Sequence, residues 1–228
     1  MSKNVIITGT SSGIGFELVK LFSENNHNIL AISRNNEALR ILDLPNVSTI
    51  DFDLTKSEDF SSLDDILNSF ENIDILINSA GVSDVIMPTI DQEFKNWQRI
   101  IDINLTGTFL TCQAVAAGML ARGDGNIVNV SSIAGLVGLP RRNAYTASKH
   151  GVAGITKTLA AEWGSGGIRV NAVAPGLIST GMFDNLGDNK NAALANMGKN
   201  IPLGRVGEAE EDAKAIVMIM ENSYIKPV

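Results

Sequence analysis

Cysteine, histidine, tyrosine and basic residues are all scarce in this sequence of 228 residues. The single cysteine, Cys112, excludes an internal disulfide, and chains without disulfides are typical of reducing compartments. His27 and His150 lie far from each other and from Cys112 along the chain, so no metal site is expected. The chain has 18 basic and 25 acidic residues, and the resulting net charge of −7 argues against a protein that binds nucleic-acid phosphates.

A signal for secretion or membrane insertion is also missing. The chain does not open with a basic region followed by an apolar run, so we expect no secretory signal. The longest apolar stretch, residues 100–120, contains Asp102, Asn104 and Gln113, and we expect it to be a buried core helix. The expected protein is therefore cytoplasmic and contacts neither membrane nor nucleic acid. Because no linker composition interrupts the sequence, residues 1–228 are expected to form a single domain.

Short apolar runs alternate with longer segments in which apolar residues recur at helical spacing. The runs are nearly continuous in apolar residues, as in strands buried on both faces of a parallel sheet. They cover residues 4–8, 28–33, 47–51, 74–78, 126–131 and 168–174. Helices are expected between them, one of them over residues 60–70. The alternation predicts right-handed βαβ units and hence an α/β fold, a doubly wound parallel sheet in three layers.

The first predicted strand runs directly into a glycine-rich turn, TGTSSGIG at residues 8–15, and a helical pattern follows. Gly9 permits the tight turn, Gly13 lets the backbone approach a pyrophosphate, and Gly15 lets the helix pack near the strand. The helix start would add free N–H groups and the positive end of the helix dipole. An ordinary glycine turn has a similar composition, but the strand before it and the helix after it favour a dinucleotide site.

The end of the second predicted strand indicates which dinucleotide is bound. An acidic residue there would accept the ribose 2′-hydroxyl of NAD(H), whereas an arginine accommodates the 2′-phosphate of NADP(H). The sequence has Ser33 and Arg34 at this place and no acid. A guanidinium suits phosphate oxygens, so NADP(H) is favoured over NAD(H). The alternative is that Arg34 is only a solvated loop residue.

A candidate catalytic set lies later in the chain. Ser132 follows the fifth predicted strand, Tyr145 lies 13 residues further on, and Lys149 four residues after that. On a helix, Tyr145 and Lys149 share one face. An ammonium beside a phenol lowers the phenol pKa from about 10, which would let Tyr145 act as a general acid and base. Ser132 would donate a hydrogen bond to a substrate carbonyl oxygen. A tyrosine and a lysine at this spacing are more often a structural pair on a helix. The interpretation of Tyr145 and Lys149 as catalytic therefore depends on the glycine turn and the sheet pattern found in the same chain.

With these motifs the sequence resembles the short-chain dehydrogenase/reductases, in the shorter subgroup with the TGxxxGxG turn, over nearly the whole chain. The resemblance extends to further segments. These are Asp53-Leu54 at the adenine position, Asn78-Ser79-Ala80-Gly81 with Ser79 replacing an asparagine, Asn104 at the catalytic asparagine, and Pro175-Gly176 with Ile178 and Thr180 on the nicotinamide side. The implied fold is Rossmann-like.

The resemblance implies an NADP(H)-dependent oxidoreductase that interconverts a carbonyl and a secondary alcohol by hydride transfer, with Asn104, Ser132, Tyr145 and Lys149 as catalytic residues. It implies that Lys149 lowers the pKa of Tyr145 and bonds the nicotinamide ribose, and that Asn104 kinks its helix and holds a water. The implied cofactor-binding residues are Gly9, Ser11, Ser12, Gly13, Ile14, Gly15, Ser33, Arg34, Asp53, Leu54, Asn78, Ala80, Gly81, Tyr145, Lys149, Pro175, Gly176, Ile178 and Thr180.

The sequence departs from the family pattern at its end. The segment that usually forms a final sheet strand is not recognisable, and the chain stops at YIKPV, residues 224–228. We therefore expect a sheet without its final strand. In the family that it resembles, members often form tetramers through that strand and the helix before it. We expect a homodimer through the helices that contain Asn104 and Tyr145, because their apolar content is high, with a homotetramer as the alternative.

The substrate is less well encoded, beyond a small carbonyl or alcohol. Apolar residues after Gly176 are expected to form a lid, or else a plain surface segment; they are Met182, Phe183, Leu186 and Met197. Arg141-Arg142 is interpreted as a solvated loop pair. One alternative function is a 3-oxoacyl-(acyl-carrier-protein) reductase, although Gly123 and Gly166 stand where such enzymes carry basic residues, with Arg122 and Arg169 nearby. Another alternative is a non-enzymatic NADP(H)-sensing module.

Overall fold

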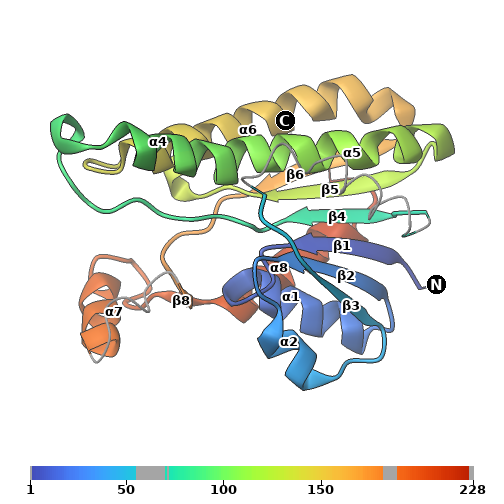
Figure 1. Cartoon of the computed structure of the whole chain (residues 1–228), viewed down its shortest axis with the longest axis horizontal. Coiled ribbons are helices and arrows are strands. Elements are labelled where there is room, and N and C mark those ends of the chain that lie inside the picture. Colours follow the sequence, from blue (N-terminus) through green and yellow to red (C-terminus); the bar gives the residue numbers. More distant parts are fainter. Residues whose placement is uncertain (1, 55–69, 71, 182–188, 226–228) are drawn as a thin grey trace.

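The centre of the computed structural model is a parallel sheet of six strands in the order β3-β2-β1-β4-β5-β6 (Figure 1). The structure describes residues 2–54, 70, 72–181 and 189–225. The strands are β1 (Asn4–Thr8), β2 (Asn28–Ser33), β3 (Val47–Asp51), β4 (Ile75–Asn78), β5 (Gly125–Val130) and β6 (Ile168–Val173). The first three strands match the sequence prediction to the residue, and the other three match within one residue at each end.

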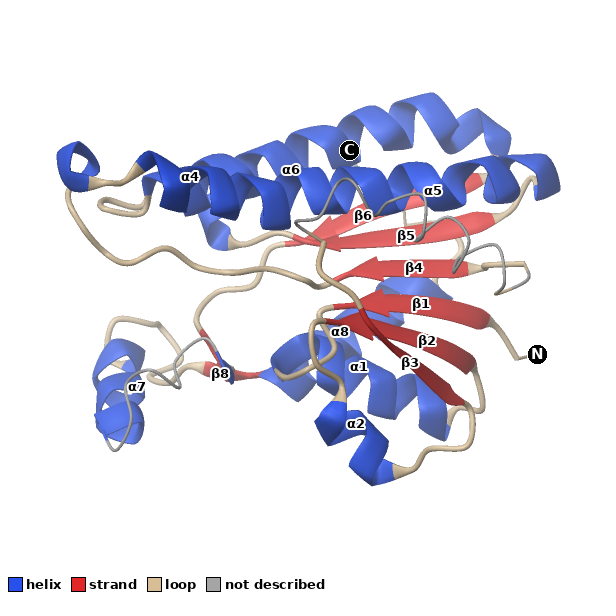
Figure 2. Ribbon diagram, viewed as in Figure 1, coloured by secondary structure: helices blue, strands red, loops and turns tan. Residues whose placement is uncertain are grey.

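Helices cover both faces of this sheet, which gives the three layers expected from the sequence (Figure 2). On one face lie α4, α5 and α6, and on the other lie α1 and α8. The helices are α1 (Gly13–Glu24), α2 (Glu37–Leu42), α4 (Phe94–Ile101), α5 (Gly107–Arg122), α6 (Asn143–Trp163), α7 (Lys190–Gly198) and α8 (Ala209–Glu221). A small separate sheet pairs β7 (Ile178–Ser179) with β8 (Gly207–Glu208). The helix expected over residues 60–70 falls almost entirely outside the described residues.

The continuous apolar strands are explained by two hydrophobic cores, one on each face of the sheet. Successive strand residues point to opposite faces. On β1, Val5 and Ile7 pack in the core that contains α1 and α8. Ile6 between them packs in the core that contains Val115 and Met119 of α5. All five side chains are buried, and each contributes roughly 1.5–3 kcal/mol relative to exposure.

The edge of the sheet at β6 agrees with the expectation that the final strand is missing. Among the described residues, no seventh strand pairs with β6. Its side chains instead hold the backbone at and after the end of α8. Arg169 donates to the carbonyl oxygens of Ile219 at 3.2 Å and Met220 at 2.9 Å, and Asn171 donates to that of Ile225 at 3.3 Å.

The helical run Phe94–Arg122 contains α4, a π-helical turn η3 (Asp102–Thr106) and α5. Judged by length and composition alone, this run is long and apolar enough to cross a membrane, and no other helix in the described part of the chain is. Half of its most apolar window is buried inside the molecule, and the core helix of a soluble protein passes the same test. This burial is in keeping with the core helix expected over residues 100–120.

Candidate active site

The strand order places a crevice at the carboxyl ends of β1 and β4. From β1 the chain proceeds outward to β2 and β3, and then returns to form β4 on the other side of β1 (Figure 2). At such a switch point the adjacent connections leave in opposite directions, and ligands of open α/β sheets bind there. A large pocket lies at this position. Among the residues predicted from sequence, its lining includes Gly9, Ser11, Ser12, Gly13, Ile14, Ser33, Arg34, Asp53, Leu54, Ala80, Gly81, Ser132, Tyr145, Lys149, Pro175, Gly176, Ile178 and Thr180.

The glycine turn forms one wall of this pocket. Gly9 has φ of +75°, and a Cβ there would lie 2.5 Å from the backbone nitrogen and Cα of Ala80. Gly15 lies beneath the turn, outside the pocket lining, and a Cβ there would lie 2.3 Å from the carbonyl oxygen of Gly9. The backbone of the turn therefore lies close to the segment after β4 on one side, and the start of α1 is open to the pocket on the other. That cradle suits the diphosphate of a dinucleotide.

A buried asparagine that the sequence interpretation missed ties this wall together. Asn36 has no exposed surface. Its Oδ1 accepts hydrogen bonds from the hydroxyls of Thr10 at 2.6 Å and Ser33 at 3.0 Å. Its Nδ2 donates to the carbonyl oxygen of Ile50 at 2.8 Å and to Asp51 at 3.1 Å. Asn36 thus connects the glycine turn to the ends of β2 and β3, and nothing in the sequence distinguishes it from an ordinary loop asparagine.

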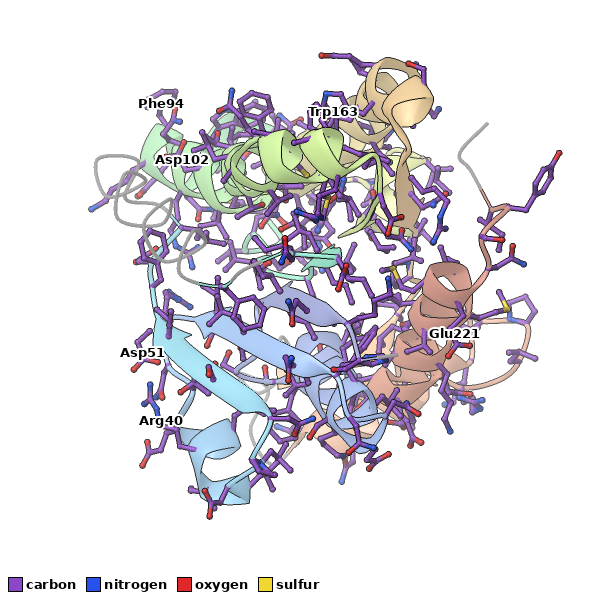
Figure 3. The ribbon with its side chains drawn as sticks, turned by 90° about the vertical axis from the view of Figure 1, so that its right-hand side faces the viewer. Arg40, Asp51, Phe94, Asp102, Trp163 and Glu221 are labelled. Atoms are coloured by element: carbon purple, nitrogen blue, oxygen red, sulfur yellow. The ribbon has the colours of Figure 1, made fainter. Side chains whose placement is uncertain are left out.

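Two arginines near the end of β2 have different surroundings. Arg40 makes an ion pair with Asp51 at 2.7 Å (Figure 3). Arg34 is exposed at the rim of the pocket. Within the described residues, the Arg34 guanidinium makes no hydrogen bond or ion pair with another side chain. It is therefore available to a ligand, whereas Arg40 is already neutralised.

Tyr145 and Lys149 share one face of α6, as their spacing predicts. The Lys149 ammonium lies 5.8 Å from the centroid of the Tyr145 ring and donates to the carbonyl oxygen of Val130 at 2.8 Å. Lys149 is buried, and this burial lowers its pKa to about 8. Its ammonium is therefore held between β5 and the tyrosine with little contact with solvent.

The pKa of Tyr145 is shifted in the direction opposite to the predicted one. Burial raises the pKa of Tyr145 above its usual value, and the nearby Asp84 carboxylate acts in the same direction. A hydrogen bond with Ser132 and the charge of Arg142 offset this increase only in part. The phenol therefore carries its proton at neutral pH, which is the state needed to protonate a carbonyl oxygen during reduction.

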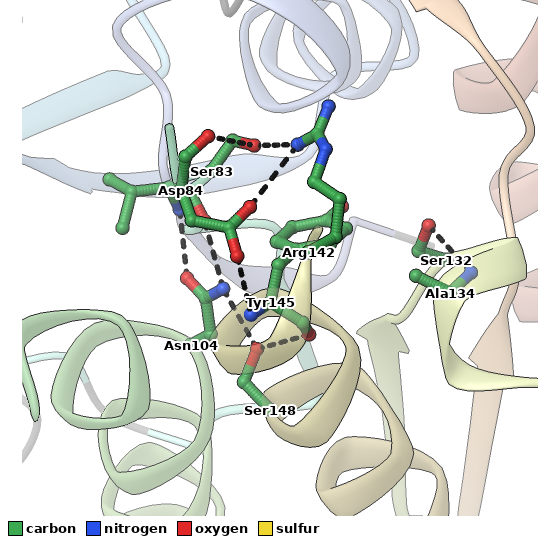
Figure 4. A network of polar contacts seen from close by, with 9 residues as sticks. Ser83, Asp84, Asn104, Ser132, Ala134, Arg142, Tyr145 and Ser148 are labelled. Carbon is green, nitrogen blue, oxygen red and sulfur yellow. Dashed lines mark hydrogen bonds and ion pairs between the residues drawn. The ribbon is translucent and has the colours of Figure 1, made fainter. Parts of the chain in front are cut away.

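Ser132 lies at the end of β5 and begins the short helix η4 (Ile133–Gly135). Its Oγ accepts the backbone N–H of Ala134 at 3.1 Å (Figure 4). The hydroxyl can still donate its own proton, because this bond uses only a lone pair. Ser132 is thus fixed by the local backbone while it borders the pocket beside Tyr145.

Asn104 lies in the π-helical turn between α4 and α5, where the resemblance led us to expect a kinked helix. Its Oδ1 accepts the backbone N–H of Val82 at 2.8 Å, and its Nδ2 donates to the Val82 carbonyl oxygen at 2.9 Å and to Ser148 at 3.1 Å (Figure 4). Asn104 does not line the pocket itself. It lies directly behind it, because a Cβ at Gly81 would be 3.4 Å from both Asn104 Oδ1 and Lys149 Nζ.

Asn78, predicted to bind the cofactor, also lies outside the pocket lining. It is buried, and its Nδ2 donates to Asn129 at 3.0 Å and to Cys112 at 3.3 Å. Its Oδ1 accepts a hydrogen bond from Thr111 at 2.7 Å. The side chain therefore joins β4 to β5 and α5. The same burial raises the pKa of Cys112 to about 12, so this thiol is not ionised at neutral pH.

The neighbouring residues Arg141 and Arg142 have different surroundings in the structure. Arg141 is exposed, in keeping with a solvated loop, whereas Arg142 lines the pocket and only 22% of its side chain is exposed. Its guanidinium contacts Ser83, lies 3.5 Å from the carboxylate of Asp84, and stands 5.7 Å from the centroid of the Tyr145 ring (Figure 4). The solvated-loop interpretation is wrong for Arg142. No sequence signal links it to Asp84, which lies 58 residues away.

The apolar residues expected to form a lid are only partly described. Met182, Phe183 and Leu186 lie outside the described residues. Met197 lies on α7, is half-buried and does not line the pocket.

Comparison with known proteins gives consistent matches. A family model described as short chain dehydrogenase matches residues 3–191. The 3-oxoacyl-(acyl-carrier-protein) reductase FabG of Chlamydia trachomatis is 38% identical over 99% of this chain and 93% of its own length. Carbonyl reductase family member 4 of Xenopus laevis is 36% identical over 99% of this chain and 94% of its own length.

Solved structures share the fold over nearly the full length. ElxO with NADP bound has a TM-score of 0.90 and 31% identity, covering 99% of this chain and 95% of its own. 4-Hydroxyisoleucine dehydrogenase complexed with NADH has a TM-score of 0.90 and 33% identity, covering 99% of this chain and 94% of its own. Structures of this shape therefore include complexes with either form of the nicotinamide cofactor.

Proposed function

This chain belongs to the short-chain dehydrogenase family and is an oxidoreductase that acts on carbonyl or alcohol groups with a nicotinamide cofactor, and from that premise we propose an NADP(H)-dependent reductase with Tyr145 as its acid and base. The catalytic set proposed is Asn104, Ser132, Tyr145 and Lys149. One observation carries the proposal: Ser132, Tyr145 and Lys149 line the same pocket as the glycine turn.

The chemistry follows from the positions of these side chains. A reduced nicotinamide cofactor held in this pocket by the glycine turn would supply the hydride for the carbonyl carbon of the substrate. Tyr145 donates its proton to the carbonyl oxygen, which thereby becomes an alcohol. Ser132 donates a hydrogen bond to that oxygen as it gains negative charge. Lys149 holds a positive charge below the tyrosine ring, and Asn104 fixes the loop after β4 through Val82. In alcohol oxidation each transfer runs in reverse.

The preference for NADP(H) rests on Arg34. It is exposed at the pocket rim beside Ser33, and an acidic residue that would repel a 2′-phosphate is absent from this position. A guanidinium can bind phosphate oxygens through two parallel hydrogen bonds. The pocket lining near Arg34 includes Gly9, Ser11 and Ser12, so the adenosine end of the cofactor would lie on this wall.

The variant Arg34→Asp is expected to reverse the cofactor preference. The aspartate would repel the 2′-phosphate and accept the ribose hydroxyl, so the ratio of kcat/KM for NADPH to that for NADH should fall by about 100-fold. The measurement is the initial rate with each cofactor on one carbonyl substrate. Arg141→Asp is the matched control, because Arg141 is exposed and lies outside the pocket lining. An unchanged ratio in Arg34→Asp would rule out the proposed role of Arg34.

A second candidate, 3-oxoacyl-(acyl-carrier-protein) reductase, is favoured by the similarity to the Chlamydia enzyme. Two arginines, Arg122 and Arg169, lie near the positions where such a reductase would bind the carrier protein, but both donate hydrogen bonds to backbone carbonyl oxygens within this chain. Arg122 donates to the carbonyl oxygen of Ile73, and Arg169 donates to those of Ile219 and Met220. A carrier with an acidic surface would therefore find these guanidinium groups engaged. An assay that compares acetoacetyl thioesters with simple ketones separates the two functions.

A non-enzymatic NADP(H)-sensing module is disfavoured, because the named relatives are reductases and the chain has both Tyr145 and Lys149. We further propose that residues 1–228 act as one cytoplasmic domain, in keeping with the absence of disulfides. A homodimer or homotetramer through the helices that contain Asn104 and Tyr145 is supported by the exposed Phe109 and Leu120 on α5.

A further inference from the structure

A second cation, besides Lys149, borders the pocket at the proposed catalytic tyrosine. The Cζ of Arg142 lies 5.7 Å from the centroid of the Tyr145 ring, and the side chain is about four-fifths buried. Burial of a guanidinium is costly unless its charge is used. The arginine immediately before it, Arg141, is exposed to solvent and lies outside the pocket lining. Arg142 is therefore the member of the pair that the fold brings to the reacting end of the pocket.

The guanidinium is held from one side only. Its Nη1 contacts the Ser83 hydroxyl and lies 3.5 Å from Asp84 Oδ1 (Figure 4). Asp84 is itself fixed, because its carboxylate is fully buried and its Oδ2 accepts the backbone N–H of Tyr145 at 3.3 Å. Within the described residues, Nε and Nη2 of Arg142 donate no hydrogen bond. These two nitrogens form the edge of the guanidinium that presents two parallel N–H groups.

The charged side chains around Tyr145 carry a net positive charge, which favours the binding of an anion. Arg142 and Lys149 are cationic and Asp84 is anionic, so the three side chains sum to one positive charge. All three are mostly or fully buried, so solvent screens this charge poorly. A bound carboxylate would bring the sum to zero and would satisfy the two free N–H groups of Arg142 in bidentate geometry.

We propose that Arg142 binds a carboxylate of the substrate, and that the substrates are short oxo acids and the corresponding hydroxy acids. This inference rests on the proposed function, because it concerns the substrate of the same pocket. A short substrate is required, since its carbonyl oxygen must reach the Tyr145 hydroxyl while its carboxylate reaches the adjacent guanidinium. The competing explanation is that Arg142 acts only through Tyr145, by stabilising the phenolate.

Matched pairs of acid and ester distinguish these explanations. The assay measures NADPH-dependent reduction of pyruvate and methyl pyruvate, and of acetoacetate and methyl acetoacetate. The wild type is expected to prefer an acid over its ester in at least one pair. In Arg142→Met, kcat/KM for the preferred acid should fall by roughly 10- to 100-fold, the range for a lost hydrogen bond to a charged group, while the ester changes by less than about threefold.

Arg141→Met is the matched control, since it removes the same charge one residue away and should leave both rates unchanged. Arg142→Lys should recover only part of the acid rate, because an ammonium lacks the fork of the guanidinium. Should Arg142→Met fail to fold, the wild type and Arg142→Lys suffice for the comparison. Equal wild-type rates on acid and ester would overturn the proposal, and so would an equal loss for both substrates in Arg142→Met.

A binding measurement separates failure of this inference from failure of the proposed function. Butanoate has the carboxylate but neither a keto nor a hydroxyl group, so its affinity for the enzyme with NADP⁺ can be measured by calorimetry without turnover. Its dissociation constant should rise at least tenfold in Arg142→Met and stay constant in Arg141→Met. If no carbonyl compound is reduced but butanoate binds in this way, the proposed reaction fails and the carboxylate site stands. If ketones and esters are reduced but the dissociation constant of butanoate is the same in Arg142→Met as in the wild type, only the proposed carboxylate site is ruled out.

Discussion

Replacing Tyr145 with phenylalanine is expected to lower kcat by roughly 100- to 10,000-fold, the range for loss of a general acid. The ring keeps its packing against Arg142 and Lys149, and only the hydroxyl that supplies the proton is removed. Affinity for NADPH should change by less than about threefold, because the glycine turn and Arg34 are untouched. Initial rates and a fluorescence titration with NADPH measure the two effects separately.

The chain offers a control of the same chemistry, since it has only one other tyrosine. Tyr224 is 89% exposed and lies after α8, far along the chain from the pocket residues. Tyr224→Phe should therefore retain full activity. Turnover of Tyr145→Phe at the wild-type rate would show that another group provides the proton, and the proposed mechanism would be abandoned.

The second large effect concerns the stability cost of burying Lys149. Burial lowers the pKa of this lysine from 10.5 to about 8. Between these values the unfolded chain carries a proton that the folded protein lacks, so the free energy of unfolding rises with pH. Relative to Lys149→Met, the wild type should gain roughly 3 kcal/mol of stability between pH 7 and pH 10.5. Below pH 8 the cost of the buried ammonium is present in full.

Urea unfolding of the two proteins across this pH range provides the measurement, because other titrating groups cancel in the difference. Lys157 lies on the same helix but is exposed, so Lys157→Met is the control for removing a lysine that folding does not bury. A constant difference between wild type and Lys149→Met would mean that Lys149 keeps an ordinary pKa in the folded protein. Lys149→Met should also lose most of its reductase activity at pH 7.

Much of the fold could be predicted because its signals are local. Strands β1, β2 and β4 contain runs of apolar residues such as Val5 to Ile7, and burial on both faces of the sheet produces such a run directly. The spacing of Tyr145 and Lys149 fixes a shared helix face whatever surrounds it. The glycine turn is equally local, because Gly9, with its φ of +75°, follows β1 directly and α1 begins four residues later.

The parts that escaped prediction depend on contacts between distant segments. Asp84 and Arg142 meet only because the loop after β4 passes the start of α6. Asn36 becomes a junction only when the glycine turn, β2 and β3 converge on it. The pKa of Tyr145 was predicted from one neighbour, yet the extent of burial decides its direction, and burial follows from the tertiary fold.

The π-helical turn Asp102–Thr106 has a consequence for the register of the helices around it. A π turn contains about one residue more than an α turn, and one residue corresponds to a rotation of about 100° about the helix axis. The apolar stripe of α4 is thus offset in azimuth from that of α5, although the two form one continuous rod. Removing a single residue from this turn would realign the stripes and carry the Asn104 amide away from Val82. The irregular turn therefore lets one continuous helical run pack in two different ways, with α5 against the sheet and α4 against α6.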